Sequence, residues 1–434
     1  MEALLLVGLT ASAFVAMARG WLRQEVAMPL VALLALAVTP PGEAGHALGE
    51  AFGSFGRIAV LFTAVAVPAH ALEQSGALTW VGLLVGQLVG IAMGRLRLSP
   101  RVAVSGICLL MTYVMAGLFH NTTSILVCAR VITTICESYG VRALPVLSGA
   151  LIASNLGGFS TRWGDTPNIK EAELWGLSHR DFFGEILPVN VGALLLVWVA
   201  VVIWLRRNRG VTMAPTDTFV TTYMVSRFQR SRLLTPIDGR GLVAGLLGMG
   251  AAVLAPMLAP QFELGLSGLA IVFTTLAVRS EHQRDTLLAL GVETYATLCG
   301  ILVLAHVMAG TSIGIGEALR GALAASGMSI WAVVLVSYVG TALTEAASWV
   351  MAAGPMIHAA APDRAVAWAL GAGICAGSSS LVTAASAGII LTRETEANKP
   401  DARVTFGSYI WFGLSVSLLM LCFYIVVLSV IWAR

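Results

Sequence analysis

Charged residues are scarce in this chain of 434 residues: Asp, Glu, Lys and Arg make up 11% of it, whereas hydrophobic residues make up 57%. Soluble domains carry about 25% charged residues, so the composition excludes that class. Apolar runs near 20 residues recur along the sequence, which is the length that an α-helix needs to cross a bilayer. Transmembrane strands would alternate over about 10 residues instead. The sequence therefore predicts an all-α integral membrane protein with several spans.

The sequence also lacks common motifs of metal and nucleotide chemistry. Its six cysteines are scattered through apolar segments without a C-x-x-C pair, so we interpret them as small buried residues. No H-E-x-x-H and no Walker A sequence is present, which argues against a zinc hydrolase and against direct coupling to ATP. We expect no enzyme, no cofactor and no resident metal.

Arginine is unevenly distributed. The one long polar connector, residues 206–240, carries seven arginines against two aspartates. By the positive-inside rule this connector is cytoplasmic, in a bacterial-type inner membrane. It has no aromatic pattern that would support nucleic-acid binding. It divides the chain into a first transmembrane repeat, residues 1–205, a basic linker, and a second repeat, residues 241–434.

Polar interruptions recur in the same order in both halves. A polar turn at residues 120–123, between two apolar arms, corresponds to one at residues 345–348. A glycine- and hydroxyl-rich break at residues 154–168 corresponds to one at residues 377–388. Such pairs are typical of inverted repeats around a midplane site. We expect two inverted repeats, each with about five transmembrane helices plus a re-entrant hairpin, and broken helices at the midplane.

Residues 78–96 are apolar but end in arginines, so they could span the membrane or lie on its surface. The inverted-repeat arrangement treats them as a cytoplasmic surface helix. Elsewhere we expect an interfacial segment at residues 43–55, then a span at residues 58–73 that Pro68 interrupts.

The first break resembles a known signature. Residues 155–168 read Asn155-Leu156-Gly157-Gly158-Phe159-Ser160-Thr161-Arg162-Trp163-Gly164-Asp165-Thr166-Pro167-Asn168. This stretch resembles a signature of the ion transporter superfamily, Asn-Ile-Gly-Gly-x-x-Thr-x-x-Gly-Asp-Pro-Pro-Asn. That group includes citrate transporters and dicarboxylate carriers, arsenite permeases and D-type sodium/proton antiporters. The resemblance implies their fold, transport by alternating access and a homodimer.

This chain departs from the family pattern at three places. Arg162-Trp163 stands where the family has a small pair, His120 where it has Asp or Ser, and Glu345-Ala346 where it has Asp-Asn or Ser-Asn. These departures bear on the substrate and the coupling ion rather than on the fold.

The candidate substrate- or ion-binding residues lie at the four interruptions. They are His120, Asn121, Thr122, Thr123, Asn155, Gly157, Gly158, Thr161, Arg162, Asp165, Asn168, Glu345, Ser348, Ser378, Ser379, Ser380 and Thr383. Asn121, Thr122 and Asp165 are the candidates for a sodium ion.

Asp165 has two interpretations that the sequence leaves open. A carboxylate at the centre of a membrane helix costs at least about 2.5–3.5 kcal/mol, which favours ion or proton binding, or pairing with Arg162. Asp is also a good N-cap, and Pro167 stands where a new helix would begin. Both roles can hold together.

The turn residues are equally open. Glu345 in apolar surroundings would tend towards a raised pKa, which suits proton exchange, or it lies in a loop in contact with water. His120 titrates near neutral pH or makes a structural hydrogen bond. Asn121, Thr122 and Thr123 offer oxygens to a small ion or donors to an oxyanion, or they cap the hairpin arms.

Arg162 could clamp an anion through its planar guanidinium, neutralise Asp165, or face a cavity without touching substrate. The hydroxyls of residues 378–386 can bond the backbone of their own helix, and close packing of small residues is the rival to ligand binding there. His70 and His306 occupy equivalent positions in the two halves, and a role in bridging helices is favoured over a proton relay.

We therefore predict a secondary transporter for a small, carboxylate-like anion or oxyacid, coupled to protons or another cation. A sodium/proton antiporter and an arsenite efflux permease are the alternatives with the same fold. A passive channel is a fourth possibility, although paired broken helices fit alternating access better. The expected partners are the bilayer, a small-molecule or ion substrate and a second copy of the chain.

Overall fold

The computed structural model describes residues 2–432 except 20, 120, 208–217, 259–261, 289–290, 313–315 and 397–399. Within these residues every regular element is helical, which confirms the predicted fold class. Six helical stretches in the described residues are long and apolar enough to cross a membrane. They are Pro41–Gln74, Ala77–Leu96, Pro100–Leu118, His179–Arg207, Ser280–Met308 and Phe406–Ile431.

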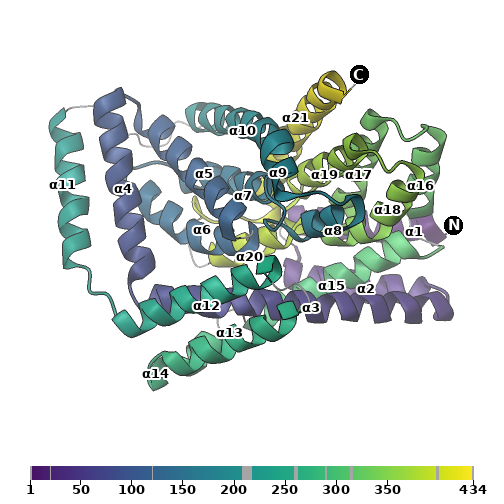
Figure 1. Ribbon diagram of the computed structural model, residues 1–434, viewed down its shortest axis with the longest axis horizontal. Helices are drawn as coiled ribbons and strands as arrows, with labels where there is room; N and C mark the ends of the chain where they lie inside the picture. The colour runs from purple at the N-terminus through teal and green to yellow at the C-terminus, as the bar shows by residue number, and fades with distance from the viewer. Residues whose placement is uncertain are drawn as a thin grey trace.

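The first half runs from the N-terminus to the basic linker (Figure 1). Its helices are α1 (Glu2–Ala18), α2 (Gln24–Val38), α3 (Pro41–Gln74), α4 (Ala77–Leu96), α5 (Pro100–Phe119), α6 (Asn121–Ser138), α7 (Ala143–Phe159), α8 (Thr166–Trp175), α9 (His179–Asp181), a π-helical turn at Phe182–Ile186, and α10 (Leu187–Arg207).

The linker contains α11 (Thr218–Leu234), and the second half follows it. Its helices are α12 (Gly239–Leu258), α13 (Glu263–Ala277), α14 (Ser280–Leu287), α15 (Gly291–Gly310), α16 (Gly316–Ala325), α17 (Ile330–Thr344), α18 (Ala346–Ala360), α19 (Arg364–Ser378), a 3-10 turn at Val382–Ala384, α20 (Ser386–Glu394) and α21 (Phe406–Trp432).

The order of elements repeats, as the sequence predicts. Each half contains a helical hairpin (α5–α6, α17–α18), then a broken helix (α7–α8, α19–α20), then a long final helix (α10, α21). The short helix after each break packs on the hairpin of the other half: α8 contacts α18, and α20 contacts α6. The two hairpins and the two breaks are thereby interlocked in one body.

A second group of helices lies beside this body. Helices α3, α12 and α13 run together along the lower edge of Figure 1, and α2 and α15 join them. Helix α3 also contacts α6, and α15 also contacts α17, α18 and α20. The boundary between the two groups therefore follows α3 and α15.

One expectation about local structure was wrong. Residues 43–73 lie in one continuous helix, α3, which Pro68 does not interrupt. Pro68 is accommodated because Gly245 and Gly248 bring α12 close to it: a Cβ at Gly248 would lie 2.8 Å from the Pro68 ring. Glycines on the neighbouring helix thus leave room for a turn that lacks one backbone hydrogen bond.

The linker contains a regular helix, α11, that packs on the first half. Helix α11 lies alongside α4, and both run across the direction of α3 and α12 at one end of the molecule (Figure 1). Phe228 of α11 covers Gly86 of α4, where a Cβ would be 2.7 Å from the ring, and stacks on Tyr139 at 5.6 Å.

Candidate functional site

The two broken helices are alike at the residues that flank the break, although the second break also contains the 3-10 turn Val382–Ala384. Helix α7 ends at Ser160 (φ −81°, ψ −7°), and α19 ends at Ser379 (φ −89°, ψ −6°). The next helix starts after an extended residue in both cases, Asp165 (φ −149°, ψ 151°) and Ala385 (φ −144°, ψ 144°). The paired interruptions that the sequence shows are therefore alike in conformation.

Glycines hold each break against its hairpin. A Cβ at Gly157 would lie 2.1 Å from the carbonyl oxygen of Tyr113 on α5, and one at Gly377 would lie 2.6 Å from that of Tyr338 on α17. Neither position has room for a side chain. Close approach of backbones is the reason that both breaks need glycine.

Asp165 caps the helix after the first break. Its Oδ1 accepts a hydrogen bond from the backbone N–H of Thr166 at 2.8 Å. Its Oδ2 accepts one from Nδ2 of Asn121 at 2.9 Å, and the N–H of Asn121 donates to the carbonyl oxygen of Gly164 at 2.8 Å. The capping role is thus present, and it fixes the hairpin turn to the break.

Other predicted residues hold the first break together. Nδ2 of Asn168 donates to the carbonyl oxygens of Gly158 and Thr161, both at 2.7 Å. The hydroxyl of Thr161 donates to the carbonyl oxygen of Gly117 on α5 at 2.9 Å. These side chains satisfy backbone acceptors that the interrupted helix leaves free.

In the second break the hydroxyls bond their own helix. Ser378 and Ser379 donate to the carbonyl oxygen of Cys375 at 3.0 and 2.9 Å, and Ser380 donates to that of Gly377 at 2.6 Å. This is the local alternative to ligand binding. Thr383 differs, because its buried hydroxyl has no hydrogen-bond partner among the described residues.

Glu345 occupies the turn of the second hairpin. It is 7% exposed and has φ +89°, a conformation that is costly for a residue with a side chain. Its Oε2 accepts hydrogen bonds from the N–H groups of Ala347 at 2.9 Å and Ser348 at 3.2 Å. Glu345 is therefore a buried cap and not an exposed loop residue.

The four interruptions meet between the halves. Asp165 and Glu345 are close enough to interact electrostatically. The hydroxyls of Thr122 and Ser386 lie 3.1 Å apart, and Nδ2 of Asn155 donates to the Ser379 hydroxyl at 3.2 Å. Each of these contacts joins one half to the other.

The charge at this meeting point is uncompensated. In the described part of the chain no Lys, Arg or His forms an ion pair with Asp165 or Glu345. Two neighbouring carboxylates repel each other unless a proton or a cation is bound. Their hydrogen-bond partners are N–H donors: Nδ2 of Asn121 and the backbone N–H of Thr166 for Asp165, and the backbone N–H groups of Ala347 and Ser348 for Glu345.

Arg162 and Trp163 point elsewhere. The Trp163 ring contacts His179 with ring centroids 4.9 Å apart, and its Nε1 donates to the carbonyl oxygen of Leu118 at 3.3 Å. Arg162 acts electrostatically on the same His179, and no ion pair joins it to Asp165 among the described residues. His120 and the side chain of Thr123 lie outside the described part of the chain.

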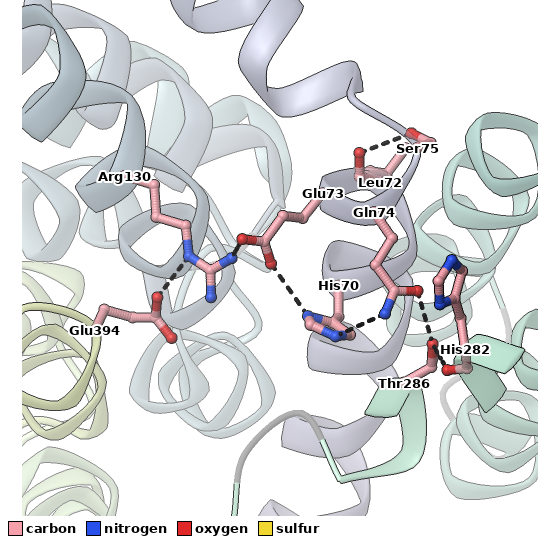
Figure 2. Close-up of polar contacts among 9 residues, drawn as sticks. All are labelled: His70, Leu72, Glu73, Gln74, Ser75, Arg130, His282, Thr286 and Glu394. Carbon is pink, nitrogen blue, oxygen red and sulfur yellow. Dashed lines mark hydrogen bonds and ion pairs between the residues drawn. The ribbon is translucent and has the colours of Figure 1, made fainter. Parts of the chain in front are cut away.

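The sequence reasoning missed Arg130. This residue of α6 pairs with Glu73 on α3, and its Nε donates to Glu394 of α20 at 2.6 Å (Figure 2). It therefore connects the hairpin, the half-helix of the second break and the helix at the boundary between the two groups. Its signal in the sequence is a single charge within an apolar hairpin arm.

His70 completes this network. Its Nδ1 lies 3.1 Å from Glu73, and Nε2 of Gln74 lies 3.1 Å from its Nε2 (Figure 2). Oε1 of Gln74 accepts a hydrogen bond from Thr286 of α14 at 3.2 Å. A ring nitrogen that accepts from an amide requires the proton on Nδ1, facing Glu73. Both contacts lie within α3, so these hydrogen bonds of His70 do not bridge helices, and its connection to α14 runs through Gln74.

Two open cavities border α20 on the arginine-rich side of the molecule. One of about 450 Å³ is lined by residues that include Arg23, Thr392 and Arg403. Another of about 360 Å³ is lined by residues that include Arg23, Glu293 and Ile389. The half-helix after the second break is thus reached from this surface.

Comparison with known families identifies the chain. Residues 13–388 match the CitMHS family, described as citrate transporter. This chain belongs to that family. It is a multi-pass membrane transporter and not an enzyme.

Two curated relatives of this citrate transporter family member cover most of the chain. A 46 kDa membrane protein of Mycobacterium leprae (strain TN) is 24% identical over 327 residues, which cover 72% of this chain and 74% of the relative. The magnetosome protein MamN of Magnetospirillum gryphiswaldense (strain DSM 6361 / JCM 21280 / NBRC 15271 / MSR-1) is 26% identical over 292 residues, or 65% and 64% of the two chains.

A solved structure, the YdaH transporter of Alcanivorax borkumensis, aligns over 88% of this chain and 86% of its own. The sequence identity is 16% and the TM-score is 0.39.

Proposed function

We propose that this chain is a secondary transporter that carries a small carboxylate-like anion or oxyacid across a bacterial inner membrane by alternating access, coupled to protons or another cation. The supporting observation is the pair of Asp165, which is partly buried, and Glu345, which is 7% exposed; the two interact electrostatically, and neither has a cationic partner in the described residues. A bound proton or cation relieves the repulsion of the pair, and its loss restores that repulsion. Occupancy of the site can therefore be coupled to conformation.

The surroundings of the pair fit this role. Both carboxylates cap half-helices at interruptions of the membrane body, where free backbone groups can meet a ligand. Asn121, Thr122 and Asp165 supply the oxygens proposed for sodium. Hydroxyl and amide groups of Thr122, Asn155, Ser379 and Ser386 lie where the two halves touch.

The test uses purified protein in proteoliposomes with labelled citrate as the probe. We expect uptake when a pH gradient is imposed, and its loss when a protonophore collapses that gradient. Uptake driven by a sodium gradient alone would assign sodium as the coupling ion. Flux at channel-like rates, independent of both gradients, would contradict a secondary transporter.

Matched variants tie the activity to the pair. Asp165→Asn and Glu345→Gln keep the size of each side chain and remove its charge, so both are expected to abolish gradient-driven uptake. Glu281→Gln, which changes an exposed carboxylate of α14, serves as the control and is expected to transport normally. Unchanged uptake in both site variants would remove the basis of the proposal.

The sodium/proton antiporter is the second candidate, because the same carboxylate pair could exchange one ion for the other. Sodium-driven proton movement in vesicles without any carboxylate would support it. An arsenite efflux permease is tested in the same vesicles with arsenite. We further propose that the linker, residues 206–240, is cytoplasmic and that the transporter works as a homodimer.

A further inference from the structure

Glu171 is a second buried carboxyl, one that the sequence reasoning did not single out. It lies on α8 and is fully buried, and neither of its carboxyl oxygens has a hydrogen-bond partner among the described residues. Its wall is apolar and tight: a Cβ at Gly371 of α19 would lie 2.7 Å from Oε2 and 2.3 Å from the Phe159 ring. Buried polar groups without partners are rare, and a buried charge without one is very costly.

Two further polar groups without hydrogen-bond partners among the described residues lie where α8 contacts α18. Trp175 stands one turn after Glu171 on the same face of α8, and its Nε1 is buried without a partner. His358 of α18 meets the Trp175 ring with centroids 4.9 Å apart, and its Nδ1 is also buried without a partner. Glu171, Trp175 and His358 thus form a row that leads from the break towards the end of α8.

The second half shows that the fold does not need a carboxyl here. Counted from the residue that precedes each half-helix, Asp165 and Ala385, the position of Glu171 corresponds to Leu391 on α20. Leu391 is fully buried as well. A leucine therefore satisfies packing at this position of a half-helix, and packing alone does not explain Glu171.

We propose that Glu171 is a proton-binding site of the transporter, separate from the Asp165–Glu345 pair and reached along the row of Trp175 and His358. The carboxylate takes up one proton to become the neutral acid, which its apolar wall favours, and releases it when water or His358 gains access. The inference rests on the proposed proton coupling and adds a residue to it. The site holds the coupling proton and does not contact the transported anion.

The groups around Glu171 leave it without a counter-charge. The titratable groups that act on Glu171 electrostatically are Asp165, which precedes α8, and Cys375 on α19; α18 carries His358, which contacts Trp175, and α7 contributes no titratable side chain. The nearest lysine in sequence, Lys170, pairs with the exposed Glu173 at 3.0 Å. Protonation is then the means by which Glu171 stays neutral.

Infrared difference spectroscopy of the purified protein in lipid tests the site without any substrate. The carboxylic-acid C=O band is recorded at neutral pH for the wild type, Glu171→Gln, Glu171→Leu and the control Glu173→Gln. We expect one carboxylic-acid signal to disappear in both Glu171 variants and to persist in Glu173→Gln. A spectrum that is identical in all four proteins would overturn the proposal. Glu171→Leu introduces the residue type that the corresponding position of α20, Leu391, carries. This variant is therefore expected to fold even if Glu171→Gln does not.

Transport then assigns the role. In citrate-loaded proteoliposomes we expect Glu171→Gln to retain citrate exchange without a gradient and to lose most pH-driven accumulation. Exchange and pH-driven accumulation that are both unchanged would overturn the coupling role. If the wild type itself carries no citrate, the proposed substrate is wrong, whereas the infrared result still decides whether Glu171 binds a proton.

Discussion

The two broken helices have similar backbone conformations at the residues that flank the break, and they differ in chemistry. The first has Asp165 before its half-helix, and the second has Ala385 in nearly the same conformation. The hairpins show the reverse: the turn of the second carries the buried Glu345, while the first offers Asn121 to Asp165. Each half thus brings one carboxylate to the meeting point, from a different element. The two halves have the same order of hairpin and broken helix, whereas the positions of the two carboxylates differ between them.

The same contrast holds at the contacts between the half-helices and the hairpins of the opposite halves. Arg130 joins α6 to Glu394 of α20. At the corresponding contact of α18 with α8, a Cβ at Gly354 would meet Leu174 at 3.1 Å, and the His358 ring packs against Trp175. An ion pair joins the first two helices, whereas side-chain packing joins the other two.

The largest expected effect comes from making the two breaks alike. Asp165→Ala copies Ala385 and removes the cap of α8, the bond from Asn121 and half of the carboxylate pair. We expect gradient-driven uptake to fall below detection. Ala385→Asp is the reciprocal variant, and it should not restore uptake to Asp165→Ala, because Glu345 is held by the other turn. Restoration would mean that the two breaks are interchangeable.

Glycine substitution compares the close approaches. Gly157→Ala and Gly377→Ala both force a methyl group against a carbonyl oxygen, with a greater overlap at Gly157. Overpacking of this kind costs about 1–3 kcal/mol, so both variants should melt at lower temperature in detergent, Gly157→Ala more so. Gly8→Ala, at a position with no neighbour within 4 Å, is the control. Equal melting of all three proteins would contradict the tight contacts.

Asn168→Ala isolates how the first break is closed. The substitution leaves the carbonyl oxygens of Gly158 and Thr161 without this donor, which costs about 1–3 kcal/mol for buried groups. We expect a lower melting temperature and a higher KM for the probe. Asn168→Asp, which cannot donate both bonds, should behave like the alanine variant, and a stable Asn168→Asp protein would argue against the hydrogen bonds.

Arg130→Gln is expected to have the smallest effect on stability. Arg130 and Glu73 are each about one-third exposed, so solvent screens the pair and its loss should cost about 1 kcal/mol or less. The transport rate should change more than the stability, because the Arg130–Glu73 ion pair connects the hairpin to α3 at the boundary between the two groups of helices. A measurement of kcat against melting temperature separates the two effects. Recovery in Arg130→Lys, which keeps the positive charge beside Glu73 and Glu394, would support the ion pairs.

Much of the architecture could be predicted from the sequence. Apolar length, the positions of glycine and polar turns, and the arginine-rich connector gave the helical class, the hairpins and both breaks, because a bilayer tolerates polar irregularity only at buried or wet places. Prediction failed where a neighbour decides the outcome. Pro68 lies within one long helix because glycines on α12 leave room for it, and α11 is ordered where Phe228 covers Gly86 of α4.

The sequence by itself determined that this chain is a membrane transporter with paired interruptions, and that Asp165 and Glu345 are its notable carboxylates. The tertiary structure alone decided that these two carboxylates interact and that Arg162 forms no ion pair with Asp165 among the described residues. It also decided that Arg130 joins three helices and that the Glu171 carboxyl has no hydrogen-bond partner among the described residues. The physical reason is distance. Helical periodicity and polarity are local properties of the chain, whereas the cost of a buried charge depends on which distant side chains the fold brings beside it.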